Sequence, residues 1–461
     1  MRETWSTLDQ RVSRLTNHDA ARIKTYMTEP AKIVLSTFGS FGDIHPYMAI
    51  AHELKSRGHE ATIATMAFYR EKISDAGLGF AAVRPDVPGP KEQNAELVEK
   101  IMNPRTGPKF LLEELIFPVV REGYQDLLVA TRGADLLVTH PAAPAGPLVG
   151  YKTGMPWIST VLAPMSFFSH YDPPVPPFWP WLNNLRALGP GFMKFFHGLM
   201  KAMFKAEQVT AFRDELSIPD YGNPVFEGQH SPILTLALFS ELFGSRQPDW
   251  PNQTRITGFC FYDEDQQPMS RELSDFLDSG PPPIVFTLGS SAVWVARDFY
   301  AESIRAAQAL NRRAVLLVGD ERNHPGSLPK DVIAVDYAPY SSLFPRACAV
   351  VHHGGVGTTS HGLRGGSPTL IVPFAFDQPD NAEHARRLGT SRTLYRDNYN
   401  AASATRELGT MLSDSLYTQR ATYVRQRLQQ ENGPECAADL IEQTLAGTLK
   451  RIEEPSYALG N

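Results

Sequence analysis

The chain has 461 residues, of which 42% are hydrophobic and 20% are charged, and its net charge is −6. This composition excludes a disordered chain, and the length favours two α/β domains over a single core. The negative net charge argues against a nucleic-acid-binding protein, whose binding surface is basic. Three widely spaced cysteines (Cys260, Cys348 and Cys436) form no metal-type motif, so we expect a cytoplasmic protein in a reducing compartment.

Residues 1–30 are predicted to form a polar N-terminal extension. They contain no apolar stretch of the kind found in a signal peptide or a transmembrane segment. Met27 would itself make a normal start of translation. Residues 1–26 are therefore either a mobile extension or a wrongly assigned start.

The first domain is predicted to begin with an apolar strand at 32–36. A loop at 37–46, helical spacing at 47–54 and a second strand at 61–65 follow, which predicts a parallel sheet. The loop carries Asp43 and His45 at the carboxyl end of its strand, where such sheets bind ligands. Asp43 could instead cap the helix, and His45 could be a packing histidine. The loop lacks the third glycine of a dinucleotide fingerprint, which argues against NAD.

His140 ends the next predicted strand, at 136–140, and another strand follows at 157–161. His140 is therefore expected at the same edge of the sheet as Asp43. If the two side chains are in contact, each would shift the pKa of the other. A buried histidine at the end of a strand also has purely structural uses.

Aromatic and proline residues are concentrated at 163–182, and Phe and Met recur at helical spacing, with lysines between them, at 192–204. The pattern predicts a pocket for an apolar or aromatic small molecule. The helical face could also contact a membrane surface peripherally, or it could pack on its own domain. The candidate pocket residues are Phe167, Phe168, Tyr171, Phe178 and Trp179.

A strand at 233–238 ends the first domain, which we place at 31–245, and a linker is predicted at 246–282. The linker is rich in proline, acidic residues and glutamine. It contains the triplet Asp263-Glu264-Asp265, which has the form of a metal-binding Asp-x-Asp motif. Because it lies in a linker and not after a strand, we interpret it as a solvated acidic turn and predict no metal site.

The second domain, placed at 283–435, opens with a strand at 284–288 that leads into Gly289-Ser290-Ser291. Further strands are expected at 314–318 and 332–335, the latter followed by Tyr337-Ala338-Pro339. After the apolar residues 350–351 come two histidines and the glycine-rich run His353-Gly354-Gly355-Val356-Gly357-Thr358, which predicts a strand, a tight loop and a helix start. Such a loop points backbone N–H groups and a positive helix end at a phosphate or diphosphate.

The strand predicted at 369–372 leads into Pro373-Phe374-Ala375-Phe376-Asp377-Gln378. Asp377 and Gln378 therefore lie at a ligand-binding edge of the sheet, where a carboxylate beside an amide suits adjacent sugar hydroxyls. They could instead cap the following helix. Helices are expected over about 402–449.

Together these motifs resemble the donor-binding region of family 1 nucleotide-sugar glycosyltransferases of the GT-B fold. The run PFAFDQPDNA is similar to the rhamnosyltransferases that build rhamnolipids, and HHGGVGTT is similar to bacterial sterol and macrolide glucosyltransferases. The resemblance implies two Rossmann-like α/β domains facing across a cleft. The first would bind an acceptor and the second a nucleotide sugar. The C-terminal segment, 436–461, would cross back to the first domain.

The resemblance also implies residue roles. In plant members the first loop supplies a histidine base; Asp43 occupies that place here, and His140 occupies the place of the aspartate that orients it. The candidates for the base are thus Asp43, His140 and His45. Tyr337 stands where a tryptophan stacks on the nucleobase, and His361 where an acidic residue holds the ribose. The implied donor-binding residues are Gly42, Gly289, Ser290, Ser291, Tyr337, Ala338, His353, Gly355, Gly357, Thr358, Asp377 and Gln378.

The implied reaction is inverting, metal-independent transfer of a hexose, with UDP-glucose as the first choice of donor. The acceptor would be a hydroxyl of a polyphenol, sterol, macrolide or lipid. One alternative is a dTDP-rhamnose-dependent rhamnosyltransferase acting on a lipid hydroxyl. Others are a GT-B nucleotide-sugar epimerase and a nucleotide-sugar-binding protein without catalysis. The chain is expected to be a monomer or a homodimer.

Overall fold

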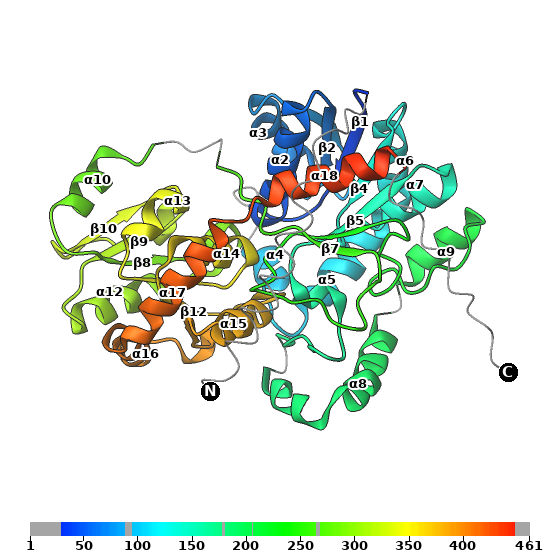
Figure 1. The fold of residues 1–461 in the computed structure, drawn as a ribbon. Helices are drawn as coiled ribbons and strands as arrows, with labels where there is room; N and C mark the ends of the chain where they lie inside the picture. Colours follow the sequence, from blue (N-terminus) through cyan, green and yellow to red (C-terminus); the bar gives the residue numbers. More distant parts are fainter. Residues whose placement is uncertain (1–28, 88–94, 178–179, 205, 264–267, 448–461) are drawn as a thin grey trace.

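Two parallel β-sheets, each with helices packed around it, form the two halves of the molecule (Figure 1). The computed structural model describes residues 29–87, 95–177, 180–204, 206–263 and 268–447. Nearly all of the predicted N-terminal extension lies outside these residues. Among the described residues, all strand pairings within the two sheets are parallel, which confirms the predicted fold class of two α/β halves.

The first sheet has seven strands in the order β3-β2-β1-β4-β5-β6-β7, and the second has six in the order β10-β9-β8-β11-β12-β13. The first sheet contains β1 (Lys32–Ser36), β2 (Glu60–Thr65), β3 (Gly79–Ala82), β4 (Leu136–Thr139), β5 (Trp157–Val161), β6 (Thr235–Ala237) and β7 (Thr254–Ile256). The second contains β8 (Ile284–Thr287), β9 (Ala314–Leu317), β10 (Val332–Val335), β11 (Ala349–His352), β12 (Thr369–Ile371) and β13 (Ser391–Thr393).

The central strands are mainly apolar because helices cover both faces of each sheet. Ile33, Val34 and Leu35 of β1 are all buried, as are the four residues of β8. The helices of the first half are α2 (Phe41–Ser56), α3 (Arg70–Asp75), α4 (Ala95–Ile101), α5 (Gly107–Phe110), α6 (Val120–Ala130), α7 (Ala145–Thr153), α8 (Pro190–Met203) and α9 (Glu207–Glu215). Those that follow are α10 (Arg271–Asp278), α11 (Gly289–Ala292), α12 (Phe299–Ala309), α13 (Tyr340–Leu343), α14 (Val356–Gly365), α15 (Gln378–Arg387), α16 (Ala401–Ser413), α17 (Ser415–Leu428) and α18 (Gly433–Leu445).

The strand order reverses between β1 and β4 in the first sheet and between β8 and β11 in the second. In open parallel sheets, ligands bind beside the carboxyl ends of the strands at such a reversal. The loops after β1 and β4 carry Asp43 and His140, and those after β8 and β11 carry Ser290 and His353. The topology therefore places all four at positions that favour ligand binding.

Two predicted boundaries need correction. The loop predicted at 37–46 becomes helical at Phe41, because Ser40 caps α2 and accepts a hydrogen bond from the Gly42 N–H. The segment predicted as a linker, 246–282, contains β7, which pairs with β6, and α10, whose Leu273 and Leu277 are buried in the second half. A proline-rich and acidic composition concealed these two short elements.

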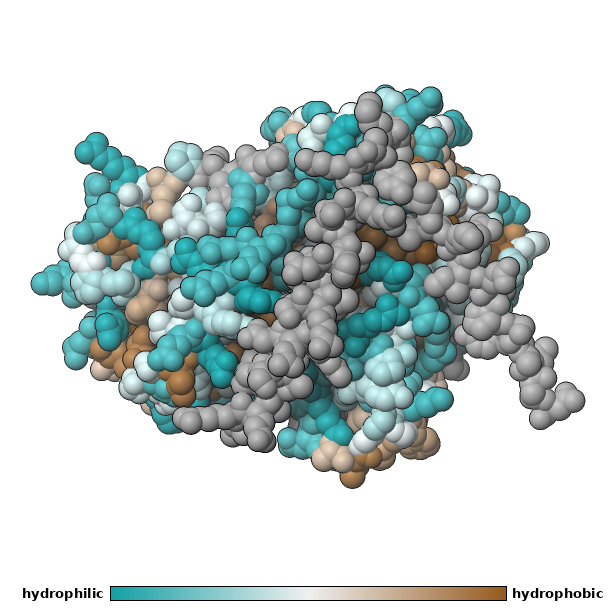
Figure 2. Space-filling model, viewed as in Figure 1, coloured by the Kyte–Doolittle hydropathy of each residue, from teal (hydrophilic) through white to brown (hydrophobic). Residues whose placement is uncertain are grey.

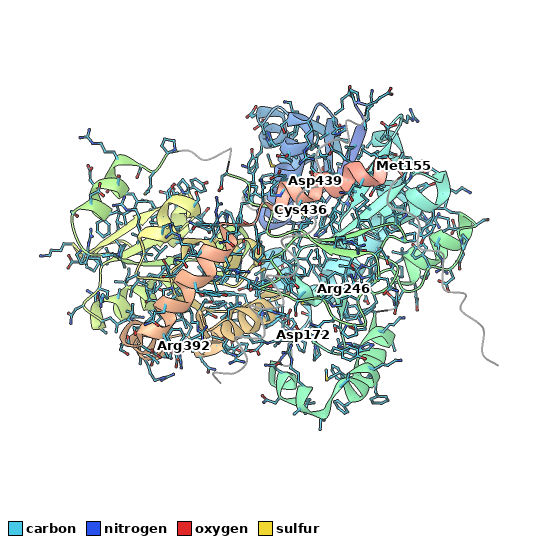
Figure 3. All side chains as sticks on the ribbon, in the orientation of Figure 1. Met155, Asp172, Arg246, Arg392, Cys436 and Asp439 are labelled. Carbon is cyan, nitrogen blue, oxygen red and sulfur yellow. The ribbon has the colours of Figure 1, made fainter. Side chains whose placement is uncertain are left out.

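Helix α18 lies against α2 of the first half after the chain has completed the second (Figure 1). Its residues Ala437, Ala438 and Ile441 belong to the core of the first half. Figure 3 labels Asp439 on this helix. Arg57, at the end of α2, donates hydrogen bonds to Asp439 Oδ1 at 2.6 Å and to Glu442 Oε2 at 2.8 Å. The end of the chain is therefore held to the first half by both apolar and ionic contacts.

The loop after β5 is joined to α15 of the second half near Asp172 (Figure 3). Arg387 donates to Asp172 Oδ1 at 2.8 Å, and the Val175 N–H donates to Asp380 Oδ1 at 2.9 Å. Burial alone would lower the pKa of His384, but the carboxylates of Asp380 and Asp172 raise it to about 9. His384 is therefore a cation near neutral pH, and it balances part of the acidic charge at this junction. None of the described helices has the length and apolar character needed to cross a bilayer.

Replacing Arg57 by alanine should weaken the attachment of α18. Because Arg57 is only 20% exposed and its charged hydrogen bonds are partly shielded from water, we expect unfolding to require about 2 kcal/mol less. Lys32→Ala is the control, because the Lys32–Glu60 pair is 59% and 70% exposed and should contribute less than about 0.5 kcal/mol. Chemical denaturation of both variants measures the difference. Equal losses of stability would contradict this view of the contact.

Candidate functional site

A cavity of about 440 Å³ lies between the two halves, where the loops that follow their central strands meet. This volume is within the range of small-molecule sites. The first half contributes Gly42, Asp43 and His140 to its wall. The second half contributes Ser290, Ser291, Trp294, His353, Gly355, Val356, Gly357, Thr358, Phe376, Asp377 and Gln378.

The carboxylate of Asp43 is fixed by the start of its own helix. Asp43 Oδ2 accepts hydrogen bonds from the Ser40 N–H at 2.7 Å and from Ser40 Oγ at 3.1 Å, which completes a capping box. Its other oxygen, Oδ1, lies 3.6 Å from His140 Nε2. Asp43 therefore caps the helix, as the alternative interpretation of the sequence held, and also presents one oxygen beside His140.

His140 is held as a neutral imidazole with its proton on Nε2. Its Nδ1 accepts a hydrogen bond from the Ala142 N–H at 3.1 Å, so in the neutral ring the proton is on Nε2. Burial lowers the pKa of His140 to about 3. The proton on Nε2 faces Asp43, so of this pair only Asp43 has a free lone pair for a substrate proton. Burial also raises the pKa of Asp43 to about 6, although hydrogen bonds from Ser40 oppose the shift.

The N-termini of α2 and α14 face each other across the cavity. A Cβ atom added at Gly357 would lie 3.5 Å from the Cα atom of Gly42. The helix starting at Val356 is capped by Gly355, so α14 directs free N–H groups at this region, and both helices direct the positive ends of their dipoles at it. An anionic group such as a diphosphate is the ligand that this arrangement favours.

His353 occupies a space that two glycines leave open. A Cβ atom at Gly289 would lie 2.4 Å from His353 Cε1, and one at Gly355 would lie 2.5 Å from His353 Nε2. Burial lowers the pKa of His353 to about 4, so the ring is neutral near pH 7. Its Nδ1 is buried without a hydrogen-bond partner among the described residues. The ring is therefore held in place and retains hydrogen-bonding capacity for a ligand.

The turn that presents Asp377 is stabilised by the side chain of Gln378. Gln378 Oε1 accepts hydrogen bonds from the N–H groups of Phe374 at 2.7 Å and Ala375 at 3.0 Å, while Phe376 adopts a left-handed φ of 55° that is uncommon for a bulky residue. Because the carbonyl oxygen of Gln378 is used in this way, its amide nitrogen is the group left to bind a ligand. The backbone strain at Phe376 is local to the cavity.

Asn381 links this turn to the glycine loop. Its Nδ2 donates to Asp377 Oδ2 at 2.7 Å and to the Gly354 carbonyl at 2.9 Å. Burial raises the pKa of Asp377 to about 7; the hydrogen bond from Asn381 lowers it, and the nearby carboxylate of Asp43 raises it further. The two carboxylates thus come from different halves and face the same cavity.

Comparison with known proteins assigns the chain to a family. Residues 33–120 match the glycosyltransferase family 28 N-terminal domain, and residues 304–443 match the erythromycin biosynthesis protein CIII-like C-terminal domain. An O-mycaminosyltylonolide 6-deoxyallosyltransferase of Streptomyces fradiae is 32% identical over 426 residues, which are 89% of this chain and 97% of that protein. The chain belongs to the GT-B glycosyltransferases.

Other relatives agree with this assignment. A sterol 3-beta-glucosyltransferase of Arabidopsis thaliana is 27% identical, over 92% of this chain and 67% of that protein. The crystal structure of the glycotransferase of kitacinnamycin superposes with a TM-score of 0.68 at 20% identity, over 91% of this chain and all of that one. The spinosyn forosaminyltransferase gives a TM-score of 0.66 at 17% identity with the same coverage. The predicted GT-B fold and the predicted class of enzyme are confirmed.

Several residues proposed for the glycosyltransferase site lie away from its cavity. His45 stacks on Phe41 at 5.3 Å and lies 5.4 Å from the Tyr262 ring, and it is not among the described residues that line the cavity. Tyr337 is 60% exposed, whereas Ala338 is buried, and neither lines the cavity. Gly289 acts indirectly, by leaving space for His353.

Of the aromatic residues predicted to bind the acceptor, Phe167, Phe168 and Tyr171 are not among the described residues that line the cavity. Phe167 is buried and stacks on Trp250 at 4.0 Å, so it belongs to the core. Phe168 packs on Phe226, and Tyr171 is exposed. Phe178 and Trp179 lie outside the described residues. The prediction failed for Phe167 because aromatic content alone does not show which side chains point inward.

The apolar wall is instead built from segments that sequence reasoning missed. Val98 and Met102, in and just after α4, line the cavity and also pack into the core of the second half. Short elements interrupted by Gly107 and Pro108 gave no periodic signal in this part of the sequence. The remaining apolar lining is Phe38, Met66, Phe68, Tyr69, Val87, Ile101, Pro108, Leu111, Leu115, Pro141, Ala142, Leu162, Ala163, Met165 and Trp294.

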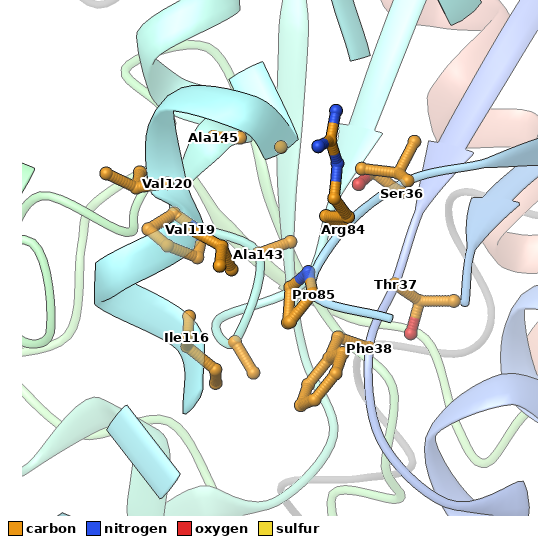
Figure 4. Close-up of a pocket in the computed structure, with 14 residues that line it drawn as sticks. Ser36, Thr37, Phe38, Arg84, Pro85, Ile116, Val119, Val120, Ala143 and Ala145 are labelled. Carbon is orange, nitrogen blue, oxygen red and sulfur yellow. The ribbon is translucent and has the colours of Figure 1, made fainter. Parts of the chain in front are cut away.

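A second cavity, of about 20 Å³, lies beside the first (Figure 4). Phe38 and Ala142 line both. Its other lining residues include Pro85, Ile116 and Val120, and its volume is that of a single water molecule. It is therefore too small for a substrate of its own.

The acidic triplet of the predicted linker is only partly described. Asp263 forms an ion pair with Arg364 of α14 at 2.5 Å, so it is not simply a solvated turn residue. Glu264 and Asp265 lie outside the described residues. Within the described part of the chain, no group of three or more His, Cys, Asp or Glu side chains is placed to hold a metal ion.

Replacing Gly289 by alanine should displace His353, because the new Cβ atom would lie 2.4 Å from its ring. We expect UDP or dTDP to bind about tenfold more weakly, which corresponds to roughly one charge-assisted hydrogen bond. Isothermal titration calorimetry measures the change. Gly133→Ala is the matched control: its φ is also left-handed, at 70°, but no atom lies within 4 Å of its added Cβ. Unchanged nucleotide binding by Gly289→Ala would show that His353 takes no part in it.

Proposed function

We propose that this glycosyltransferase moves a hexose from a nucleoside diphosphate sugar to a hydroxyl group of a bulky apolar acceptor, with inversion and without a metal ion. The observation that carries the proposal is the position of Asp43. Its free oxygen lies on the first half and faces, across one cavity, the glycine loop of the second. A proton acceptor and an anion-binding loop on opposite walls suit direct displacement at a sugar carbon.

In the proposed reaction, the acceptor hydroxyl gives its proton to Asp43 Oδ1 while its oxygen attacks the anomeric carbon. The bond from that carbon to the diphosphate oxygen breaks on the opposite face, so the configuration inverts. General-base assistance of this kind is typically worth about 10²–10⁴ in rate. His140 Nε2 lies 3.6 Å from Asp43 Oδ1, and because Nε2 carries the proton, His140 does not compete for the substrate proton.

The negative charge that develops on the departing diphosphate is stabilised by the second half. His353, the backbone N–H groups near Gly357 and the hydroxyl of Thr358 are the donors that we assign to it. The opposing N-terminus of α2 adds to the positive potential through Gly42. Asp377 and the amide nitrogen of Gln378 are assigned to the sugar hydroxyls. Ser290 and Ser291, which also line the cavity, are assigned to the phosphate oxygens.

The acceptor is proposed to be large and mainly apolar. The glycine loop forms a polar part of the cavity wall, whereas another part consists of Phe, Met, Leu, Ile and Val side chains. The two relatives described above are named for a tylonolide and for sterols, which supports an acceptor of this kind. Because the family transfers sugars and this wall has no use in epimerisation, we do not propose an epimerase.

Two donors are proposed, and one experiment separates them. UDP-glucose is the choice made from the sequence, and the sterol relatives are named as glucosyltransferases. A dTDP-linked 6-deoxyhexose, the class that includes rhamnose, is the second candidate. The name of the 32%-identical relative, a 6-deoxyallosyltransferase, favours this donor. The side-chain carbonyl of Gln378 also favours it, because this oxygen already accepts a backbone hydrogen bond and leaves fewer groups to bind sugar hydroxyls.

Asp43→Asn should reduce kcat about 100-fold or more while nucleotide binding persists, because the amide cannot accept the proton. In the unaltered enzyme kcat/KM should fall tenfold per pH unit below about pH 6. The active form is the deprotonated carboxylate, and burial raises its pKa to about 6. Initial rates across pH test both expectations. Asp336→Asn, at an exposed surface position, is the control. A loss of less than tenfold in Asp43→Asn would contradict the assignment of the base.

The donor is identified by thermal shift with UDP, dTDP, UDP-glucose and dTDP-rhamnose. A ligand that binds only the folded chain raises its melting temperature, by an amount set by its concentration relative to its Kd. We expect stabilisation by one nucleotide series and a further increase with the matching sugar. Asn381→Ala should abolish that further increase, since Asn381 holds Asp377 in place. The absence of a shift with every nucleotide would contradict the donor site.

A further inference from the structure

Helix α8 lies at the edge of the first half, beyond the loop that follows β5 (Figure 1). One side of the helix packs on the protein, where Met193 and His197 are buried. His197 Nδ1 lies 3.0 Å from His170 Nδ1, which ties the helix to the same loop that brings Met165 and Ser166 to the cavity wall. The helix is therefore a fixed part of the acceptor half.

The opposite side of this helix carries large apolar side chains into solvent. Leu188 lies just before the helix, at the end of the preceding 3₁₀ segment, and Phe192, Phe195 and Leu199 follow three and four residues apart along one side of α8. Their exposed fractions are 58%, 37%, 74% and 57%. Figure 2 shows hydrophobic residues gathered at the lower edge of the molecule, where α8 lies in Figure 1. A contiguous apolar stripe of this kind marks an interaction surface.

The charge of the surrounding segment is unlike that of the rest of the chain. Residues 173–206 contain no aspartate or glutamate, although 50 acidic residues in 461 would place about four in a segment of this length. The segment has four basic residues, Arg186, Lys194, Lys201 and Lys205, within a chain whose net charge is −6. Two of these residues pair with acidic side chains outside the segment, Arg186 with Asp172 and Lys201 with Glu227. The positive charge beside the apolar stripe therefore rests mainly on Lys194, next to Phe195.

We propose that the stripe of α8 docks on the surface of a membrane that contains anionic lipids. A helix with Phe and Leu on its outer face and lysines beside them matches the chemistry of such a surface: the rings enter the boundary of the acyl chains, and the cations lie among the headgroups. A second copy of the chain is a poorer occupant. An isologous contact would bring the Lys194 side chains of both copies together, and residues 173–206 supply no acidic partner for them.

Docking through α8 would also place the acceptor side of the cavity near the lipid. The loop held by His170 is the one that contributes Met165 and Ser166 to the cavity wall. An apolar acceptor dissolved in the membrane would then reach the cavity without crossing much water. This consequence rests on the proposed function, whereas the docking itself does not, and the two can fail separately.

The test is flotation of the full chain with vesicles, in the absence of any donor or acceptor. We expect the chain to float with vesicles of phosphatidylcholine containing about 30% phosphatidylglycerol, and to bind pure phosphatidylcholine about fivefold less. The double variant Phe195→Asp/Leu199→Asp should lose most of the binding to anionic vesicles. Lys194→Gln should weaken that binding and reduce its dependence on salt, because one cation no longer contributes.

Leu416→Asp is the matched control, since Leu416 is 59% exposed on α17 of the second half, and it should leave flotation unchanged. Melting temperatures without vesicles, and the nucleotide shift described above, verify that each variant is folded. Failure of the unaltered chain to float with anionic vesicles would overturn the proposal, as would equal flotation of the double variant. So would a double variant that turned a dimer into a monomer without changing lipid binding, because the stripe would then be an interface between copies.

Discussion

The close approach of two helix N-termini is the constraint on which the rest of the site depends. Gly42 at the start of α2 and Gly357 at the start of α14 meet without intervening side chains, so both positive helix ends face one small region. A Cβ atom added at Gly357 would make ordinary van der Waals contact with Gly42 Cα, at 3.5 Å, so only the space of a methyl group separates the two backbones.

Contacts at two places away from the cavity keep these helix N-termini close together. Arg57 and α18 secure the end of the chain to the first half, and the charged junction of Asp172 with Arg387 joins the loop after β5 to α15. Both contacts combine burial with paired charges, whose strength depends on their partial exclusion from water. Helix α4 contributes a third connection, because Val98 packs into the core of the second half while lining the cavity. An acceptor that contacts α4 therefore contacts both halves.

The sequence predicted those parts of the site that short local patterns determine. Asp43, His140, His353 and Asp377 each follow a strand, and a parallel sheet brings the ends of its strands to one edge, so their meeting in one cavity could be inferred from strand positions alone. Phe167 and His45 could not be placed in this way, because the direction of a side chain within a loop or helix depends on tertiary packing against residues such as Trp250 and Tyr262. Strand β7 was missed for a related reason: a three-residue strand carries no periodic signal, and its pairing with β6 defines it.

The two oxygens of Asp43 have different surroundings, and this supports the proposal that an aspartate takes the place of a histidine base. One oxygen of Asp43 is committed to Ser40 at the helix start, which fixes the side chain, and the other faces the cavity beside the proton of His140. Burial then raises the pKa of Asp43 to about 6, which makes it a better proton acceptor than an exposed carboxylate and keeps it largely ionised at neutral pH. A stronger shift would protonate the group, and a weaker one would reduce its basicity. The hydrogen bonds from Ser40 at the helix start oppose the effect of burial and hold the carboxylate between these limits, since they stabilise its charged form.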